Sequence, residues 1–402
     1  MAARSPVITG LGIVSAAGFG LDEIWRAVSR GESGLKPLTL FQSPRYGQIP
    51  VGEIQRDLVA AGAPVRSSRS DKLGWLAARD AIADAGINFE NGGERAGVIL
   101  GTSVGGSYDS ELFLTALIKR GKMRAGLARF HECSTTVDLI ADQFGLYGPS
   151  MAIATACSSS ALALAQAAEM IAAGEADVML TGGADSLSRM TWGGFHSLLL
   201  VDPAGCRPFD VTRGGMSLGE GAAILVLEAE EAAERRGAKI LARLSGWGMS
   251  CDAYHATAPH PQGAGATAAI QSALRRAGLD AAAIDYVNAH GTGPLACLRD
   301  HDPRRPSRLH HRRPRRGPEP TGAAGAHLGR PPAIARRSAA GRAGGRCLDV
   351  APAGVPPGRV SLLRRLGRNA GTAAHFTVIP GCPSPAPRPA AELHRVLPAR
   401  CR

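Results

Sequence analysis

The sequence predicts an α/β fold for residues 1–290, because strand-like and helical segments alternate along this part of the chain. Three short apolar runs have the length of buried strands. They are Val98–Leu100, Asp177–Thr181 and Gly221–Glu228. Another strand is expected at Val7–Thr9, where the chain opens.

Helices are expected between and after these strands, where good helix formers end at glycine. The segments are Lys72–Ala85, Ser159–Ala173 with a stop at Gly174, and Ala266–Ala277 with a stop at Gly278.

Cys157 stands where a strand is expected to turn into a helix. Met151–Ala154 reads as a short buried strand, and the helix from Ser159 follows. Unpaired backbone N–H groups and the positive end of the helix dipole meet at such a turn, and both favour a thiolate. The same N–H groups could hold an oxyanion. A buried structural cysteine is the alternative interpretation for an isolated residue of this kind.

Length and composition bound the class of protein. The 402 residues suffice for one large or two medium domains. Eight scattered cysteines without a CxxC pair indicate neither a disulfide framework nor a zinc site. The start of the chain leaves no room for a signal peptide, and no apolar run approaches the ~20 residues of a membrane span. We therefore expect a cytoplasmic protein.

The positive charge belongs to the C-terminal part of the chain. Of the net charge of +12, residues from 291 onward carry +16, so residues 1–290 carry −4. Seventeen of the 27 prolines also fall after residue 290, and the last lysine is Lys239. Such a composition normally stays disordered. A basic nucleic-acid-binding tail is one interpretation, and a translation of GC-rich DNA in the wrong frame is the one we favour.

The motifs of residues 5–293 resemble those of the β-ketoacyl-acyl carrier protein synthases. Thr155–Ser160 resembles the nucleophile motif of that family, and Val287–Gly293 resembles its first histidine motif. Arg207–Asp210 and Gly219–Ala222 are similar to the segment between the two halves of the family's fold. These motifs occur in the family's order.

This resemblance implies a thiolase-like αβαβα sandwich of two related halves and a homodimer. We divide the chain into an N-terminal half at 1–235, the start of a C-terminal half at 236–293, and an aberrant or disordered tail at 294–402. The second half is then incomplete. The implied reaction is the decarboxylative Claisen condensation of malonyl-acyl carrier protein with an acyl group held on a cysteine, in fatty acid or polyketide synthesis. The implied partner is acyl carrier protein, with no metal or bound organic cofactor.

Four residues receive roles through the resemblance. Cys157 would carry the acyl group, and His290 would stabilise the enolate that forms as carbon dioxide leaves. An imidazole can donate a hydrogen bond in either protonation state near pH 7. Phe209 and Thr292 would contact the substrate.

The family's pattern fails after Gly293. The lysine and second histidine motif of the family is absent, as is its closing glycine-rich segment. His327 lies 37 residues beyond His290, about where the second histidine is expected, but no lysine stands near it and we assign it no catalytic role.

Two further classes remain open from the sequence. A degradative thiolase shares the architecture but needs a second catalytic cysteine, for which Cys382 lacks strand context. An inactive synthase-like partner subunit is the other class, although such partners usually replace the nucleophile that is retained here at Cys157.

We predict that the coding DNA, read in another frame beyond the His290 codon, encodes the missing lysine, second histidine and glycine-rich segment. The chain as given should then be poorly soluble or inactive, because a half-domain without its late strands leaves a sheet edge and apolar faces exposed. Translation of all frames tests the first expectation, and soluble expression followed by a condensation assay tests the second. Activity comparable to that of a full-length synthase would contradict it.

Overall fold

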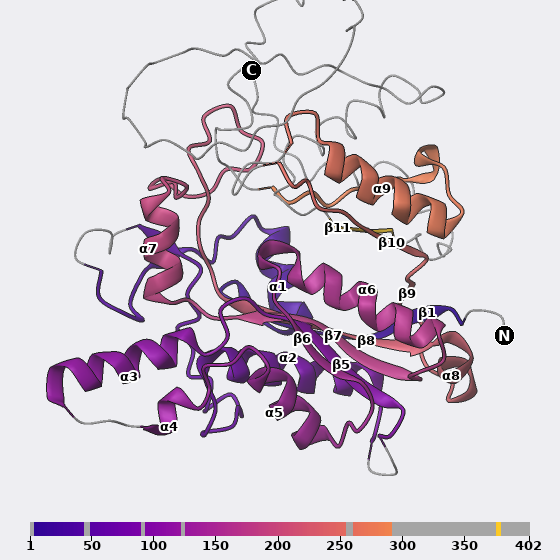
Figure 1. The fold of residues 1–402 in the computed structure, drawn as a ribbon, viewed down its shortest axis with the longest axis horizontal. Coiled ribbons are helices and arrows are strands. Elements are labelled where there is room, and N and C mark those ends of the chain that lie inside the picture. Colours follow the sequence, from indigo (N-terminus) through magenta and orange to yellow (C-terminus); the bar gives the residue numbers. More distant parts are fainter. Residues whose placement is uncertain are drawn as a thin grey trace, which may run out of the picture. The chain divides into compact units, whose positions relative to one another are not determined.

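A mixed sheet of seven strands forms the centre of the fold (Figure 1). The computed structural model describes residues 4–43, 49–89, 93–121, 125–254, 260–291 and 375–378. The strand order is β2-β1-β8-β7-β5-β6, and β9 also pairs with β1. β5 is parallel to β6 and β7, whereas β8 is antiparallel to β7 and β1. The strands are β1 (Pro6–Ser15), β2 (Gly18–Phe19), β5 (Ala96–Gly101), β6 (Ser150–Ile153), β7 (Val178–Asp185), β8 (Gly221–Ala229) and β9 (Ala242–Arg243).

Helix α2 (Arg69–Ala85) covers one face of this sheet and has strong signals at both ends. Ser68 and Asp71 form a capping box at its beginning, and Gly86 ends it in the left-handed conformation with φ 61°. Asp71 also accepts hydrogen bonds from Thr135 and Thr136, at 2.9 and 2.8 Å. These bonds fix α5 (Thr135–Phe144) beside α2.

Two glycines of β1 allow α2 to lie close to the sheet. A Cβ atom at Gly12 would stand 1.9 Å from the carbonyl oxygen of Ala77, and one at Gly10 would stand 2.4 Å from that of Ala81. Both positions therefore require a residue without a side chain. The apolar side chains of the neighbouring strands complete this core against α2, among them Val98, Leu180 and Val226.

Helix α6 (Ser159–Ala172) covers the opposite face of the sheet. Its alanines pack in a second core with Ile99, Met179 and Leu227. Each of these residues is next in sequence to one of the strand residues in the core against α2. This alternation is the period of two expected of strands. At these positions of β5, β7 and β8 both faces of the sheet are therefore buried.

A second, smaller sheet lies on the far side of α6. Its strands are β10 (Gly246–Met249) and β11 (His375–Val378), paired antiparallel. Trp247 points to α6, where its indole N–H donates to Glu169 at 2.9 Å. Gly246 and Gly248 face the other way, because a Cβ atom there would stand 2.3 and 2.1 Å from backbone oxygens of α9 (Ala264–Ala277).

The elements therefore stack in five layers: α2 with α5, the large sheet, α6, the β10–β11 pair, and α9 (Figure 1). This αβαβα order confirms the predicted fold class. Among the described residues, the second sheet has only two strands. No helix in the described ranges is long and apolar enough to cross a bilayer. The remaining elements are α1 (Gly20–Ser29), β3 (Lys36–Pro37), β4 (Pro50–Val51), α3 (Ser107–Arg120), α4 (Ala125–Ala128), η1 (Ala156–Ser158), α7 (Arg189–Ser197), α8 (Glu230–Arg235) and η2 (Ala281–Ala283).

Three details differ from the sequence-based expectations. The strand before Cys157 exists as β6, but it lies at the edge of the sheet and is not buried. Residues 284–287 form no strand, because no described strand pairs with them. In the tail expected to be disordered, His375–Val378 form β11, whose Phe376, Thr377 and Val378 are residue types common in strands.

We predict that Gly12→Ala destabilises the protein, because the added Cβ atom must displace the backbone of α2. The free energy of unfolding should fall by about 1–3 kcal/mol in urea denaturation. Gly193→Ala in α7 is the matched control, since nothing lies within 4 Å of its Cβ position. That variant should gain up to about 1 kcal/mol from helix propensity. Equal stability of the two variants would contradict the prediction.

Candidate active site

Cys157 is exposed on a sharp turn between β6 and α6. The turn is the short 3₁₀ helix η1, and its first residue, Ala156, has φ 52°. An L-residue in this left-handed region costs about 1 kcal/mol or more. The turn therefore needs other contacts to hold it, and those contacts determine where the thiol points.

Hydroxyl groups supply these contacts. Ser159 Oγ donates to the carbonyl oxygen of Ala156 at 2.7 Å and accepts from the N–H of Thr155 at 2.8 Å. Ser158 Oγ donates to the carbonyl oxygen of Thr155 at 2.8 Å. Ser103, at the end of the neighbouring strand β5, shares a 3.0 Å hydrogen bond with Ser159. The three serines hold both sides of the strained residue.

Asp185 holds the loop that carries Ser103. Its carboxylate accepts from the N–H groups of Ser103 and Val104, at 2.9 and 2.8 Å, and from the hydroxyl of Thr102 at 3.0 Å. Burial raises the pKa of the Asp185 carboxyl above its ordinary value, although the hydrogen bonds from Val104 and Ser103 act in the opposite direction. Asp185 therefore positions the loop that supports the turn with Cys157. Our reading of the sequence missed this role, and the only signal was a polar residue after the Gly182–Gly183 strand end.

Two glycines bring the beginning of α6 against the ends of β5 and β7. A Cβ atom at Gly101 would stand 2.2 Å from the carbonyl carbon of Ser159. One at Gly183 would stand 2.1 Å from Ser160 Oγ. Larger residues at either strand end would push back the helix that follows Cys157.

The histidine motif meets the segment that carries Phe209. A Cβ atom at Gly291 would lie 3.7 Å from Cβ of Pro208 and 3.9 Å from the ring of Phe209. Phe209 is 55% exposed and has φ 65°. The structure thus places Phe209 beside the residue that follows His290. Thr292 and His327 lie outside the described residues.

His290 follows an irregular segment and its side chain is exposed. Desolvation by neighbouring protein atoms lowers the pKa of its imidazole, and the contact with solvent limits this effect. This direction favours the neutral ring over the cationic one. Within the part of the chain that the structure describes, no hydrogen bond joins His290 to Cys157.

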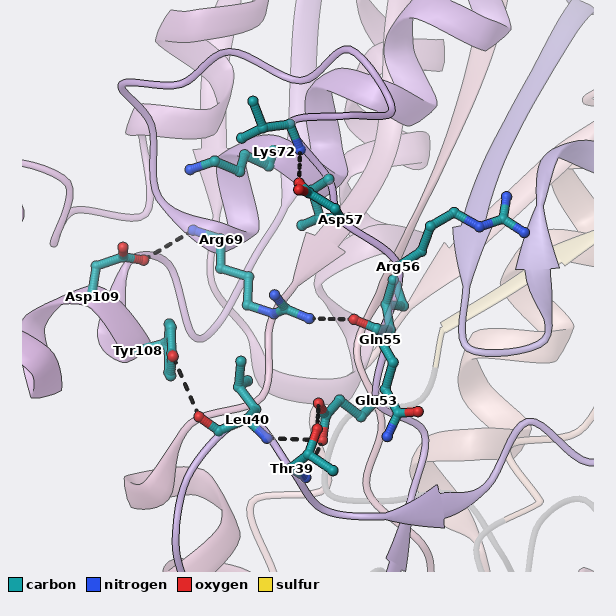
Figure 2. Close-up of a pocket in the computed structure, with 13 residues that line it drawn as sticks. Thr39, Leu40, Glu53, Gln55, Arg56, Asp57, Arg69, Lys72, Tyr108 and Asp109 are labelled. Carbon is teal, nitrogen blue, oxygen red and sulfur yellow. Dashed lines mark hydrogen bonds between the residues drawn. The ribbon is translucent and has the colours of Figure 1, made fainter.

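A cavity of about 460 Å³ lies elsewhere, between the beginnings of α2 and α3 (Figure 2). Its charged groups are already engaged. The backbone N–H groups of Arg69 and Val59 donate to Asp109 and Asp57, and the guanidinium of Arg69 is paired with Glu220 at 2.6 Å. Neither Cys157 nor His290 lines this cavity. It is therefore separate from the candidate site.

The family models match in two pieces. "Beta-ketoacyl synthase, N-terminal domain" covers residues 4–233, and "Beta-ketoacyl synthase, C-terminal domain" covers residues 241–297. A similar curated protein is 3-oxoacyl-[acyl-carrier-protein] synthase 2 of Vibrio cholerae, 36% identical over 74% of this chain and 75% of the relative. The corresponding Staphylococcus aureus protein is 33% identical over 71% of this chain and 74% of that protein.

Solved structures agree with these matches. The ishigamide ketosynthase/chain length factor is 35% identical, with a TM-score of 0.70 over 73% of this chain and 75% of that one. A second is a type II polyketide synthase acyl-carrier protein in complex with its ketosynthase bound to the hexaketide. It is 28% identical, with a TM-score of 0.65 over 73% of this chain and 74% of that one.

The chain belongs to the β-ketoacyl synthase family. More particularly, its relatives are 3-oxoacyl-acyl carrier protein synthases and ketosynthases of polyketide assembly. These findings confirm the class expected from the sequence, an acyltransferase-type condensing enzyme of fatty acid or polyketide synthesis.

We predict that iodoacetamide alkylates Cys157 faster than Cys251, by about 3- to 10-fold at pH 7, because Cys157 lies at the beginning of α6, where the helix dipole stabilises negative charge on the reacting sulfur. Both thiols are exposed, so Cys251 is the internal control, whereas Cys133 and Cys206 are half-buried. Mass spectrometry of tryptic peptides over time gives the rates. Equal rates at the two exposed cysteines would contradict the prediction.

Proposed function

We propose that Cys157 is the residue that receives an acyl group from acyl carrier protein as a thioester. The observation that carries this proposal is an exposed thiol on a strained turn at the beginning of α6, held by Ser103, Ser158 and Ser159. The Cys157 sulfur attacks the acyl thioester carbonyl and loses its proton. The bond from the acyl carbon to the carrier sulfur breaks, and the carrier thiol leaves with that proton. The N–H of Cys157 holds the tetrahedral oxyanion.

His290 acts in the second half of the reaction. Its neutral imidazole donates a hydrogen bond to the thioester oxygen of malonyl-acyl carrier protein. Carbon dioxide leaves, and the electron pair of the broken bond forms the enolate that this hydrogen bond stabilises. The carbanion attacks the acyl group on Cys157, and the Cys157 thiolate leaves. The product is a β-ketoacyl thioester on the carrier protein.

Phe209 and Thr292 are proposed to contact the substrate. The exposed ring of Phe209 and its left-handed backbone support this role. Strained backbone conformations cost free energy and are found mostly at functional sites. Gly291 leaves space between the ring and the histidine motif.

The two steps need different parts of the chain. Acyl transfer to Cys157 uses the turn at α6 and the strand ends that support it. Condensation also needs the histidines, and the family's second histidine motif is missing from this sequence. We therefore propose that the chain as given accepts an acyl group more readily than it condenses it, which refines the expectation of an inactive protein.

The expected partners are acyl carrier protein and a second copy of the chain. Strand β6 supports a homodimer, because among the described strands it pairs only with β5 and its Ser150 and Met151 are exposed. A second β6 could pair with this free edge. The cytoplasmic location and the division at residues 235 and 293 remain predictions.

We predict that Cys157→Ala lowers acylation of the protein by acyl-acyl carrier protein more than about 10³-fold, because the nucleophile is lost. Intact-protein mass spectrometry detects the acyl-enzyme. His290→Ala should leave this acylation within about threefold and lower carbon dioxide release from malonyl-acyl carrier protein instead.

Cys251→Ala is the matched control, since that thiol is exposed and lies outside the candidate site. It should behave as the unmodified chain does in both assays. Acylation that survives in Cys157→Ala, or that is lost in Cys251→Ala, would refute the assignment of the nucleophile.

A further inference from the structure

The described residues cover the α6 side of the large sheet only in part. In β8, Ala222, Ile224 and Val226 are buried against α2. The residues between them face the other side of the sheet, where Ala223 is exposed and Leu225 is half-buried. Ala223 pairs with Ile13 of β1, which is also half-buried. Paired residues share a face of the sheet, so this stripe of β8 and β1 lies on the α6 side without full cover.

Helix α1 extends this apolar stripe. Leu21, Trp25 and Val28 are 43, 71 and 61% exposed, and their spacing places them on one face of the helix. Together with Ile13 they line a hollow of about 340 Å³. In Figure 1, α1 lies on the same side of the large sheet as α6. We call Ile13, Leu21, Trp25, Val28, Ala223 and Leu225 the uncovered face.

Contiguous exposed apolar surface of this kind marks an interaction site. Trp25 is the strongest single indication, because a large ring that is mostly in water loses the free energy that burial would provide. Leu114 and Ile118 of α3 are also exposed and lie one turn apart, but neither of them lines the hollow.

The layer that covers α6 indicates what would bind the neighbouring uncovered face. Over α6 the cover is β10, through Trp247. The family's C-terminal domain supplies this layer, and its match to the chain ends at residue 297. The chain covers 75% of the Vibrio cholerae relative, so a quarter of that relative has no counterpart here. The second layer is therefore narrow, and the uncovered face lies on the same side of the sheet beside it.

We propose that the uncovered face docks a second polypeptide, one that carries the remainder of a ketosynthase C-terminal half. Its apolar strand and helix surfaces would extend the β10 layer across α1 and β8. The binding part of this proposal rests on family membership. Its catalytic consequence, a gain in condensation, also rests on the proposed function.

The test is co-expression of the full chain with the part of the Vibrio cholerae relative that follows its match to this chain. We expect the fragment to become soluble and to co-purify as a 1:1 complex by light scattering. Trp25→Glu should lower the amount of fragment that co-purifies with the chain at least about tenfold, as loss of a central aromatic anchor does. Val28→Glu should lower it as well.

Ile118→Glu is the matched control, because Ile118 is 82% exposed on α3 and lies outside the uncovered face. It should bind as the unmodified chain does. Since Trp25 and Ile118 are both largely in solvent, neither substitution removes a core contact. A fragment that stays insoluble or unbound with the unmodified chain would overturn the proposal, as would equal binding by the Trp25 and Ile118 variants.

Two other occupants give different results, and each would overturn the proposal. If a second copy of the chain covers the face, Trp25→Glu lowers the oligomeric state of the chain in the absence of the fragment. If the chain's own residues cover it, covalent footprinting finds Trp25 protected in the absence of the fragment. Acylation of Cys157 is measured on the same samples. A complex that forms without any acylation refutes the proposed function and leaves the docking surface intact.

Discussion

The contact of α6 with the ends of β5 and β7 is the constraint on which the candidate site depends. Gly101 and Gly183 have no side chains, and backbone and hydroxyl atoms of Ser159 and Ser160 occupy the space where Cβ atoms would stand. The helix can therefore begin at the edge where two parallel strands end. Cys157, one turn earlier, lies exposed at that edge and close to the N-terminal end of the helix dipole.

Strain and hydrogen bonding are balanced in this turn. The left-handed Ala156 would relax without support, and Ser103, Ser158 and Ser159 surround it with hydrogen bonds. Asp185 extends the support to the neighbouring loop by accepting three hydrogen bonds. Each bond is worth about 1 kcal/mol, which is comparable to the cost of the strained residue. The arrangement is a property of the network, and a single serine does not account for it.

The two layers of the sandwich contribute differently to function. The large sheet and α6 position Cys157, whereas His290 follows α9 and belongs to the second half of the fold. That half is represented among the described residues by β10, β11 and α9. The uncovered face on α1 and β8 is the structural counterpart of the motifs that the sequence lacks after Gly293. An incomplete second half of the fold thus accounts both for the exposure of Trp25 and for the low condensation activity that we expect of this chain.

Local signals determined the helices from the sequence alone, and they placed Cys157 at a strand-to-helix turn. α2, α6 and α9 lie within three residues of their expected bounds, because capping residues and terminal glycines act over one turn. Only the tertiary structure decided which strand is an edge, and so β6 was wrongly expected to be buried. It also decided that Asp185 supports Ser103, since 82 residues separate the two partners. Edges and long-range hydrogen bonds depend on which strands become neighbours, and no local pattern encodes that choice.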